Sequence, residues 1–302
     1  MVALKFREEF EKNYNTYLPK SSLAALQKKS IEANVIYDRI NHKAGDIVLF
    51  TGSYSTGEHN PTSDVDILIL SNESEHERRI TELNHPSIFG DSFDIRYKET
   101  DLNIEYIKLP DVFKLLSIVN TATNLYQPDL PNLQGLELRL AVRIYNGIPL
   151  LGEKDYISIK KNINIASFTS SATALSLVMA ISYFEDSLYL SEIDSRLILS
   201  NAAFCLVMSY VNSSGNITYS VKNLRGRAIS LFQNNKNYYM LNNVDSLLFV
   251  SDVSLPVGQK LVIDMIIRLI ELLQKSEYHD LTLKMLAPYL QKIPNLLNTH
   301  RA

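Results

Sequence analysis

The most informative stretch of the chain reads Val48-Leu-Phe-Thr-Gly-Ser-Tyr-Ser-Thr-Gly-Glu-His-Asn-Pro-Thr-Ser-Asp-Val-Asp-Ile-Leu-Ile-Leu70. Its first apolar residues, with Asp46 and Ile47 before them, predict a short buried strand that runs into a Gly-Ser turn. A second strand is predicted from Asp64 to Leu70. Because side chains alternate along a strand, Asp64 and Asp66 share one face while Val65 points to the other. The stretch therefore predicts two carboxylates at one spot, close to a glycine turn.

These residue types suit the binding of a phosphate together with a metal ion. Two carboxylates held close together repel each other unless a cation lies between them, and hard oxygen ligands of this kind suit Mg²⁺. Gly52 lets the chain turn tightly and lets a phosphate approach the backbone, and Ser53 adds a hydroxyl that faces the anion. We therefore expect phosphoryl or nucleotidyl transfer, in which positioning and charge neutralisation supply most of the catalysis.

The motif resembles that of the DNA-polymerase-β-like nucleotidyltransferase superfamily, in which Gly-Ser is followed, after about ten residues, by Asp-x-Asp. Here these are Gly52-Ser53 and Asp64-Val65-Asp66, with Ser63 before the first aspartate. The architecture is most similar to the streptomycin- and spectinomycin-type antibiotic adenylyltransferases. The resemblance implies a nucleoside triphosphate donor, with ATP expected, two Mg²⁺ ions held by the two aspartates, and release of pyrophosphate.

The resemblance also implies a third carboxylate on a later strand, and Glu105 is our candidate for it. It would bind the catalytic ion and take the proton of the acceptor hydroxyl. Asp101 lies just before the predicted strand Leu102–Lys108 and shares a face with Glu105. At ~3.3 Å per residue the two carboxylates are about 13 Å apart, so they cannot share one metal site. Glu105 is preferred because Ile104 and Tyr106 anchor it at the centre of the strand.

Two regions of the chain differ in pattern. Residues 1–150 mix helical periodicity with short β runs and predict an α/β (α+β) nucleotidyltransferase domain with a short mixed sheet, whereas residues 151–302 predict an all-α bundle. We place the boundary at the hinge Gly147-Ile-Pro-Leu-Leu-Gly152, where glycine and proline stop a helix. Further predicted elements are helices from Lys5 to about His42, broken near Pro19, a strand at 93–98, and helices from Asp111, at 131–145, 165–185, 189–212, 222–233, 257–276 and 279–291.

A basic segment opens one of the predicted helices of the second domain. Lys222 and Arg225, with Arg227, lie near a helix N-terminus, where cations do not favour helix stability. Two readings stay open for these residues. They form a clamp for the triphosphate, or they belong to an ordinary solvated loop.

Charge and composition narrow the choice of partners. The 302 residues carry 30 Lys and Arg against 33 Asp and Glu, a formal charge of −3, which is unlike a dedicated DNA- or RNA-binding protein. Residues 151–302 hold 14 cations and 12 anions, which disfavours a tRNA acceptor. The single cysteine, Cys205, excludes an internal disulfide and a multi-thiolate zinc site.

We found no secretory signal and no convincing membrane span, and expect a cytoplasmic protein.

The expected acceptor is therefore a small molecule with a hydroxyl group, and antibiotic modification is what the family resemblance implies for it. The alternative is a toxin or antitoxin type of nucleotidyltransferase that modifies tRNA or a protein side chain. A protein that binds nucleotide without catalysis is a third class, which the three carboxylates disfavour. The sequence identifies neither the acceptor nor the oligomeric state.

Overall fold

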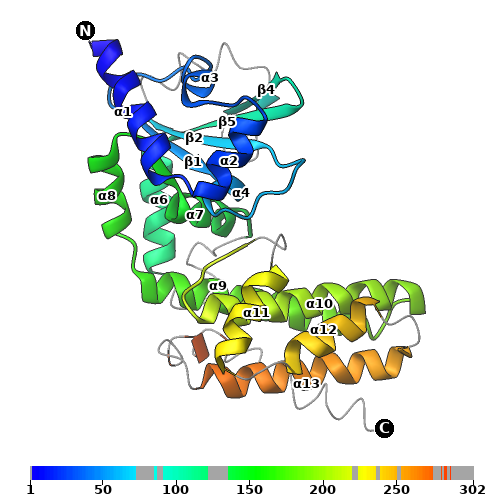
Figure 1. Cartoon of the computed structure of the whole chain (residues 1–302). Helices are drawn as coiled ribbons and strands as arrows, with labels where there is room; N and C mark the ends of the chain where they lie inside the picture. The colour runs from blue at the N-terminus through cyan, green and yellow to red at the C-terminus, as the bar shows by residue number, and fades with distance from the viewer. Residues whose placement is uncertain are drawn as a thin grey trace. The chain divides into compact units, whose positions relative to one another are not determined.

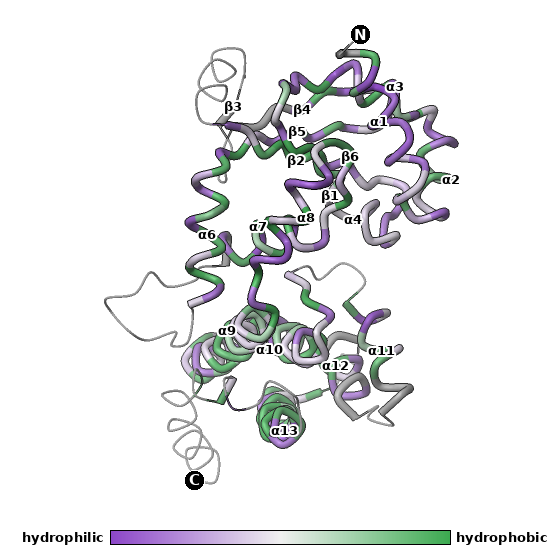
Figure 2. Tube along the Cα trace, turned by 90° about the vertical axis from the view of Figure 1, so that its left-hand side faces the viewer, coloured by the Kyte–Doolittle hydropathy of each residue, from purple (hydrophilic) through white to green (hydrophobic). Residues whose placement is uncertain are grey.

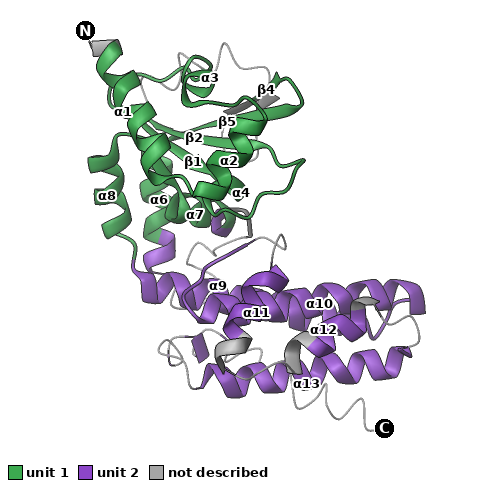
Figure 3. Ribbon diagram, viewed as in Figure 1, with its two compact units in different colours: residues 1–117, 139–163 green, residues 118–138, 164–302 purple. Residues whose placement is uncertain are grey.

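The computed structural model describes residues 2–72, 85–86, 91–121, 135–219, 224–235, 239–249, 253–274, 280, 282–283 and 286. These residues fall into two compact units (Figure 3). Residues 1–117 and 139–163 belong to unit 1, and residues 118–138 and 164–302 to unit 2. The helices α6 and α7 each contribute residues to both units.

Unit 1 is built on a six-stranded mixed sheet with the strand order β3-β4-β5-β2-β1-β6. Figure 1 labels its strands β4, β5, β2 and β1. The pair β2–β5 is parallel and every other pair is antiparallel. The strands are β1 (Ile47–Thr51), β2 (Val65–Ser71), β3 (His85–Pro86), β4 (Asp91–Tyr97), β5 (Thr100–Lys108) and β6 (Ile148–Leu151). The mixed sheet predicted for this part of the chain is thus confirmed.

Pro19 separates the first two helices of unit 1 as predicted, but the helix predicted from there to about His42 is interrupted after Lys28 and ends at Tyr37. The helices of unit 1 are α1 (Val2–Tyr17), α2 (Lys20–Lys28), α3 (Ala33–Tyr37), the short α4 (Gly52–Ser55), and α8 (Glu153–Lys161), which the sequence analysis did not predict. With them come α6 (Leu109–Thr121) and α7 (Gly135–Asn146).

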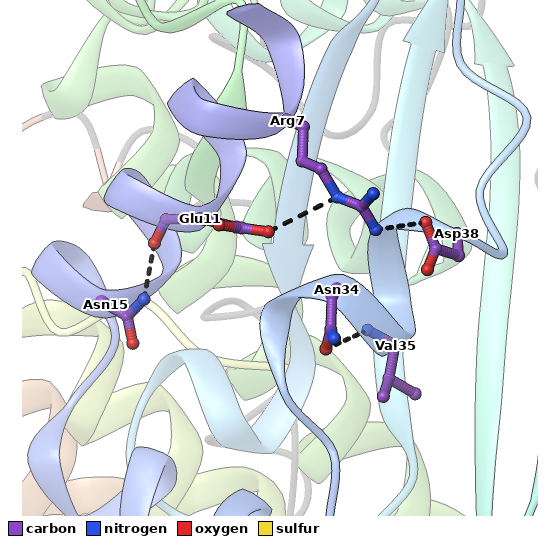
Figure 4. Close-up of polar contacts among 6 residues, drawn as sticks. All are labelled: Arg7, Glu11, Asn15, Asn34, Val35 and Asp38. Atoms are coloured by element: carbon purple, nitrogen blue, oxygen red, sulfur yellow. Dashed lines mark hydrogen bonds and ion pairs between the residues drawn. The ribbon is translucent and has the colours of Figure 1, made fainter. Parts of the chain in front are cut away.

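One face of the sheet packs on the N-terminal helices. Val65, Ile67 and Ile104 are fully buried there, together with Phe10 of α1 and Leu26 of α2. On the surface of this layer, Arg7 joins α1 to the end of α3 through an ion pair with Asp38 of 2.6 Å (Figure 4). Such exposed pairs contribute at most about 1 kcal/mol, so the apolar layer holds the helices in place.

The segment predicted as a hinge is the edge strand β6. It pairs antiparallel with β1 and buries Leu150 and Leu151, and an edge position tolerates Pro149. Gly152 follows with φ +70°, and a Cβ there would lie 2.9 Å from the carbonyl oxygen of Asp46. The predicted boundary at residues 150 and 151 thus falls inside unit 1, which the chain leaves for the last time after Ile163.

Unit 2 is helical, as predicted for the C-terminal region. Its helices are α9 (Ile165–Asp186), α10 (Glu192–Ser213), α11 (Leu224–Asn235), α12 (Tyr239–Phe249) and α13 (Leu255–Leu273); α12 was not predicted, and most of the helix predicted at 279–291 lies outside the described residues. Figure 2 shows the apolar character of α9, α10 and α13. Their core includes Leu177, Phe184, Leu206 and Leu269, all fully buried. Ser209 of α10 donates a hydrogen bond of 2.9 Å to the carbonyl of Thr173 in α9.

Helix α9 has the length and apolar composition of a membrane span. Of the most apolar 18-residue segment of this helix, 67% is nevertheless buried inside the protein. Ala174, Leu177 and Ile181 from this helix belong to the core of unit 2. We therefore describe α9 as the central core helix of that unit.

Cys205 is expected to be inert toward thiol reagents in the native protein. Its side chain is buried in α10, and burial raises the pKa of the thiol to about 11. Since the thiolate is the reactive form, little of it exists at pH 8. Ellman's reagent should label less than one tenth of the protein in an hour at that pH and all of it in denaturant. Rapid labelling of the native protein would contradict this packing.

Candidate active site

The Gly-Ser turn connects β1 to the short helix α4. Gly52 has φ +71°, a left-handed conformation that only glycine adopts without strain. A Cβ atom at this position would collide with Oδ2 of Asp66 and would lie 2.8 Å from the carboxyl carbon. The turn and the second aspartate of the motif are thus in direct contact.

The spacer between the turn and the aspartates is held by local hydrogen bonds. The backbone N–H of Asn60 donates to the Ser63 hydroxyl (2.9 Å), and Lys29, which follows α2, donates to the Ser63 carbonyl (3.3 Å). His59 stacks on the buried Tyr54 ring with a centroid distance of 4.5 Å. Burial, with a smaller effect of the Lys29 cation, lowers the pKa of His59. The spacer is therefore a defined loop that fixes the start of β2.

The two motif aspartates lie on the same face of β2, as their spacing predicted. Asp64 is exposed just before the strand and Asp66 is half-buried, while Val65 between them is fully buried in the core of the other face. Asp66 is paired with Thr51 of β1 on one side and with Asn103 of β5 on the other. A row of polar side chains thus crosses the sheet at the level of Asp66.

Glu105 lies on the same face of β5, two residues beyond the position that faces Asp66. Its partner in the parallel ladder is Leu68. Glu105 is only 7% exposed, and its Oε2 accepts a hydrogen bond of 2.7 Å from Nη1 of Arg143 in α7. The second amino group of the same guanidinium donates to the Thr51 hydroxyl (3.3 Å).

Asp101 occupies a different environment at the beginning of β5. Both of its carboxylate oxygens accept hydrogen bonds of 2.7 Å from the exposed Arg96 of β4. The hydrogen bond to Asp101 is the largest cause that raises the pKa of Arg96, and Asp64 adds a smaller effect. Asp101 precedes Leu102, the ladder partner of Val65, so it lies at the level of Asp64, whereas Glu105 lies four residues further along β5.

The Asp64–Asp66 pair fits the oxygen ligands that a hard divalent cation requires. Because residue 52 is a glycine, its backbone, and not a side chain, lies beside the Asp66 carboxylate. In the part of the chain that the structure describes, no three His, Cys, Asp or Glu side chains are grouped to hold a metal ion. The structure thus places Asp64 and Asp66 two residues apart on one face at the start of β2, and it holds Glu105 against Arg143 through Oε2.

The predicted basic clamp is described only in part. Lys222 lies outside the described residues. Arg225 lies in the first turn of α11, and its guanidinium binds Asp245 of α12 at 2.8 and 3.0 Å. This ion pair lowers the pKa of Asp245. In the structure, Arg225 therefore serves to join α11 to α12 within unit 2.

Three residues of the site were not identified from the sequence: Thr51, Asn103 and Arg143. The side-chain oxygen of Asn103 is buried and accepts no hydrogen bond among the described residues. One signal was present for Arg143. It follows Leu140 by three residues, and an arginine that is buried among apolar residues is usually paired with an anion, but Arg139 one turn earlier made this signal weak.

A family model matches the segment that contains this site. The sequence model of the nucleotidyltransferase domain family matches residues 39–121. No curated protein sequence matches the chain. Among solved structures, a nucleotidyltransferase-like protein from Exiguobacterium sibiricum 255-15 is similar, with a TM-score of 0.43 and 10% identity over 84% of this chain and 80% of that one. The segment matched by the family model contains the Gly-Ser turn, both aspartates and Glu105, so the chain carries a nucleotidyltransferase domain and is a transferase.

Proposed function

We propose that the protein transfers a nucleoside monophosphate, AMP from ATP in the first instance, to a hydroxyl group of a small molecule. The contact between Gly52 and Asp66 carries this proposal. This contact places the Asp66 carboxylate beside the backbone of a glycine. The phosphates of a metal-bound triphosphate need both groups, a carboxylate to bind the metal ion and an accessible backbone to approach. The acceptor oxygen attacks the α-phosphorus, the bond to the β-phosphate oxygen breaks, and pyrophosphate leaves.

In this proposal different residues of unit 1 bind the cations, orient the triphosphate and accept the proton. Asp64 and Asp66 would hold the two Mg²⁺ ions, and Glu105 would join them through Oε1. When bound, the ions neutralise the charge that develops on the phosphates. The turn Gly52-Ser53 orients the triphosphate through its backbone and the serine hydroxyl. Glu105 accepts the proton of the acceptor hydroxyl.

Charge supports a small acceptor over a macromolecule. The chain carries a formal charge of −3, and residues 151–302 are close to neutral, so a basic surface for tRNA is not evident from the sequence. Cationic aminoglycosides would favour a cleft rich in carboxylates, and antibiotic modification remains the family-based part of the proposal.

Lys222 and Arg225 are proposed to approach the triphosphate, which requires Arg225 to exchange its partner Asp245. The protein is proposed to act in the cytoplasm.

The two carboxylates of β5, Asp101 and Glu105, are expected to differ in their effect on the rate. Glu105→Gln keeps the volume of the side chain but removes its basicity, so it should lower kcat at least about 10²-fold, the lower range for loss of a general base. Asp101→Asn should stay near wild type, because an exposed ion pair with Arg96 contributes little. Steady-state kinetics of both variants decides this, and the reverse order would make Asp101 the third carboxylate.

Product analysis tests the function itself. The purified protein is incubated with each of the four isotope-labelled nucleoside triphosphates and Mg²⁺, in the presence of a panel of hydroxylated small molecules, of bulk tRNA, or of a protein mixture. Mass spectrometry then identifies any nucleotidyl adduct. A small-molecule adduct supports the proposal. Labelling of tRNA or protein alone would favour the toxin or antitoxin alternative, and the absence of every adduct would refute both.

A further inference from the structure

The ion pair between Arg143 and Glu105 is unusual in its burial. The two side chains are 10% and 9% exposed, whereas those of Arg96 and Asp101 are 61% and 41% exposed. A buried ion pair is weak evidence for stability, because well-packed apolar residues of the same volume are often equally stable or more so. The burial of this pair therefore calls for a reason other than stability of the fold.

The guanidinium of Arg143 spans three adjacent strands. Nη1 binds Glu105 on β5 at 2.7 Å, and Nη2 binds the Thr51 hydroxyl on β1 at 3.3 Å. The strand between them is β2, and Thr51 is the ladder partner of Asp66. One side chain thus contacts the last residue before the Gly-Ser turn and the third carboxylate, on either side of the strand that carries the aspartates.

The helix that carries Arg143 is itself fixed at this end. The hydroxyl of Tyr156 in α8 lies 2.9 Å from the carbonyl oxygen of Ile144 and 2.8 Å from that of Gly147. Burial raises the pKa of this hydroxyl, so it remains protonated and able to donate. A Cβ at Gly147 would lie 3.1 Å from Leu49 of β1, which shows how closely the helix end approaches the sheet. Arg143 therefore projects from a rigid support.

We propose that Arg143 is a positioning residue that holds Glu105 by Oε2 and turns Oε1 toward the acceptor proton. No described residue donates a hydrogen bond to Oε1. Without the guanidinium, Oε2 as well as Oε1 of Glu105 can turn toward Asp66, so the carboxylate binds the cation with both oxygens and no longer keeps one for the acceptor proton. This inference rests on the proposed function for its kinetic part, while its cation-binding part is independent of turnover.

The test combines kinetics with Mn²⁺ binding in the absence of nucleotide, measured by electron paramagnetic resonance. The variants are Arg143→Met, Arg143→Lys, Glu105→Gln and the double variant Arg143→Met/Glu105→Gln. Arg139→Met is the matched control, since Arg139 is exposed one turn earlier on the same helix. The double variant removes both buried charges, so it stays folded if Arg143→Met alone is destabilised by an unpaired carboxylate. Thermal unfolding verifies this.

We expect Arg143→Met to lower kcat about 10- to 100-fold, the usual cost of losing a group that orients an active-site ligand, with KM for the nucleotide nearly unchanged. The double variant should be no slower than Glu105→Gln alone. Arg143→Lys should recover part of the rate, because it restores the charge but not the two-pronged geometry. A wild-type kcat in Arg143→Met, or losses that multiply in the double variant, would overturn the inference.

Mn²⁺ binding decides the same question without catalysis. Arg143→Met should bind Mn²⁺ about 10-fold more tightly than wild type, because Glu105 is released, and this gain should vanish in the Glu105→Gln background. An equal gain in both backgrounds would mean that Arg143 acts on the cation directly, and no gain would mean that it does not restrain Glu105. If wild type binds Mn²⁺ with this coupling but transfers no nucleotide, the proposed function fails and the positioning role stands.

Discussion

Asp66→Ala is expected to abolish nucleotidyl transfer, with a loss of at least about 10³-fold in kcat. Removal of this carboxylate takes away a cation ligand and several kcal/mol of charge stabilisation at the phosphates, and each 1.36 kcal/mol is a factor of about ten. Asp66 is half-buried, next to Gly52 and in register with Thr51 and Asn103, so no neighbouring carboxylate occupies its place. Initial rates with labelled ATP at saturating Mg²⁺ measure the effect.

The control for this variant is Asp155→Ala, an exposed carboxylate on α8 that should leave the rate unchanged. Both variants should unfold within a few degrees of wild type, since neither removes apolar packing. A rate for Asp66→Ala within ten-fold of wild type, in a preparation free of wild-type protein, would remove Asp66 from the cation site and with it the main support of the proposed function.

The motif strands were predictable because their signals are local. The apolar residues 48–50 and 67–70 are continuous runs next to a glycine turn and a polar spacer, and the period of two along a strand places Asp64 and Asp66 on one face without any tertiary information. The family resemblance, and not a local signal, implied a third carboxylate, and the apolar neighbours of Glu105 selected it over Asp101 as the candidate. Local signals also identified the long helices α9, α10 and α13, whose apolar runs exceed the length of a strand.

The residues that local signals did not reveal are those defined by pairing over long distances in the sequence. The segment 148–151 reads as a hinge because of its proline and flanking glycines, yet it becomes an edge strand because β1 offers it a free edge, about 100 residues earlier in the chain. Arg143 meets Glu105 across 38 positions, a contact that depends on how α7 lies on the sheet. Register between β2 and β5 likewise decides that Asn103, and not Glu105, faces Asp66.

Gly52→Ala is expected to have the second-largest effect, because it combines two costs at one position. The left-handed φ of +71° costs a residue with a Cβ roughly 1–2 kcal/mol, and the new methyl group collides with the Asp66 carboxylate. To relieve the collision, Asp66 must rotate or β1 and β2 must separate. Either change displaces a carboxylate from its place beside the turn, and a displacement of about 1 Å costs on the order of 10²-fold in rate. Thermal unfolding and kcat are measured together on the purified variant.

Gly57→Ala separates these two costs. Gly57 lies in the same segment with φ +76°, but a Cβ there meets only ordinary contacts, the nearest being the Ser21 hydroxyl oxygen at 3.4 Å. Both variants should therefore lose a similar amount of stability from the backbone, while only Gly52→Ala should lose about 10²-fold or more in kcat and bind Mn²⁺ more weakly. If the two variants lose activity equally, the effect comes from the strained turn. The contact between Gly52 and Asp66 would then have no part in forming the site.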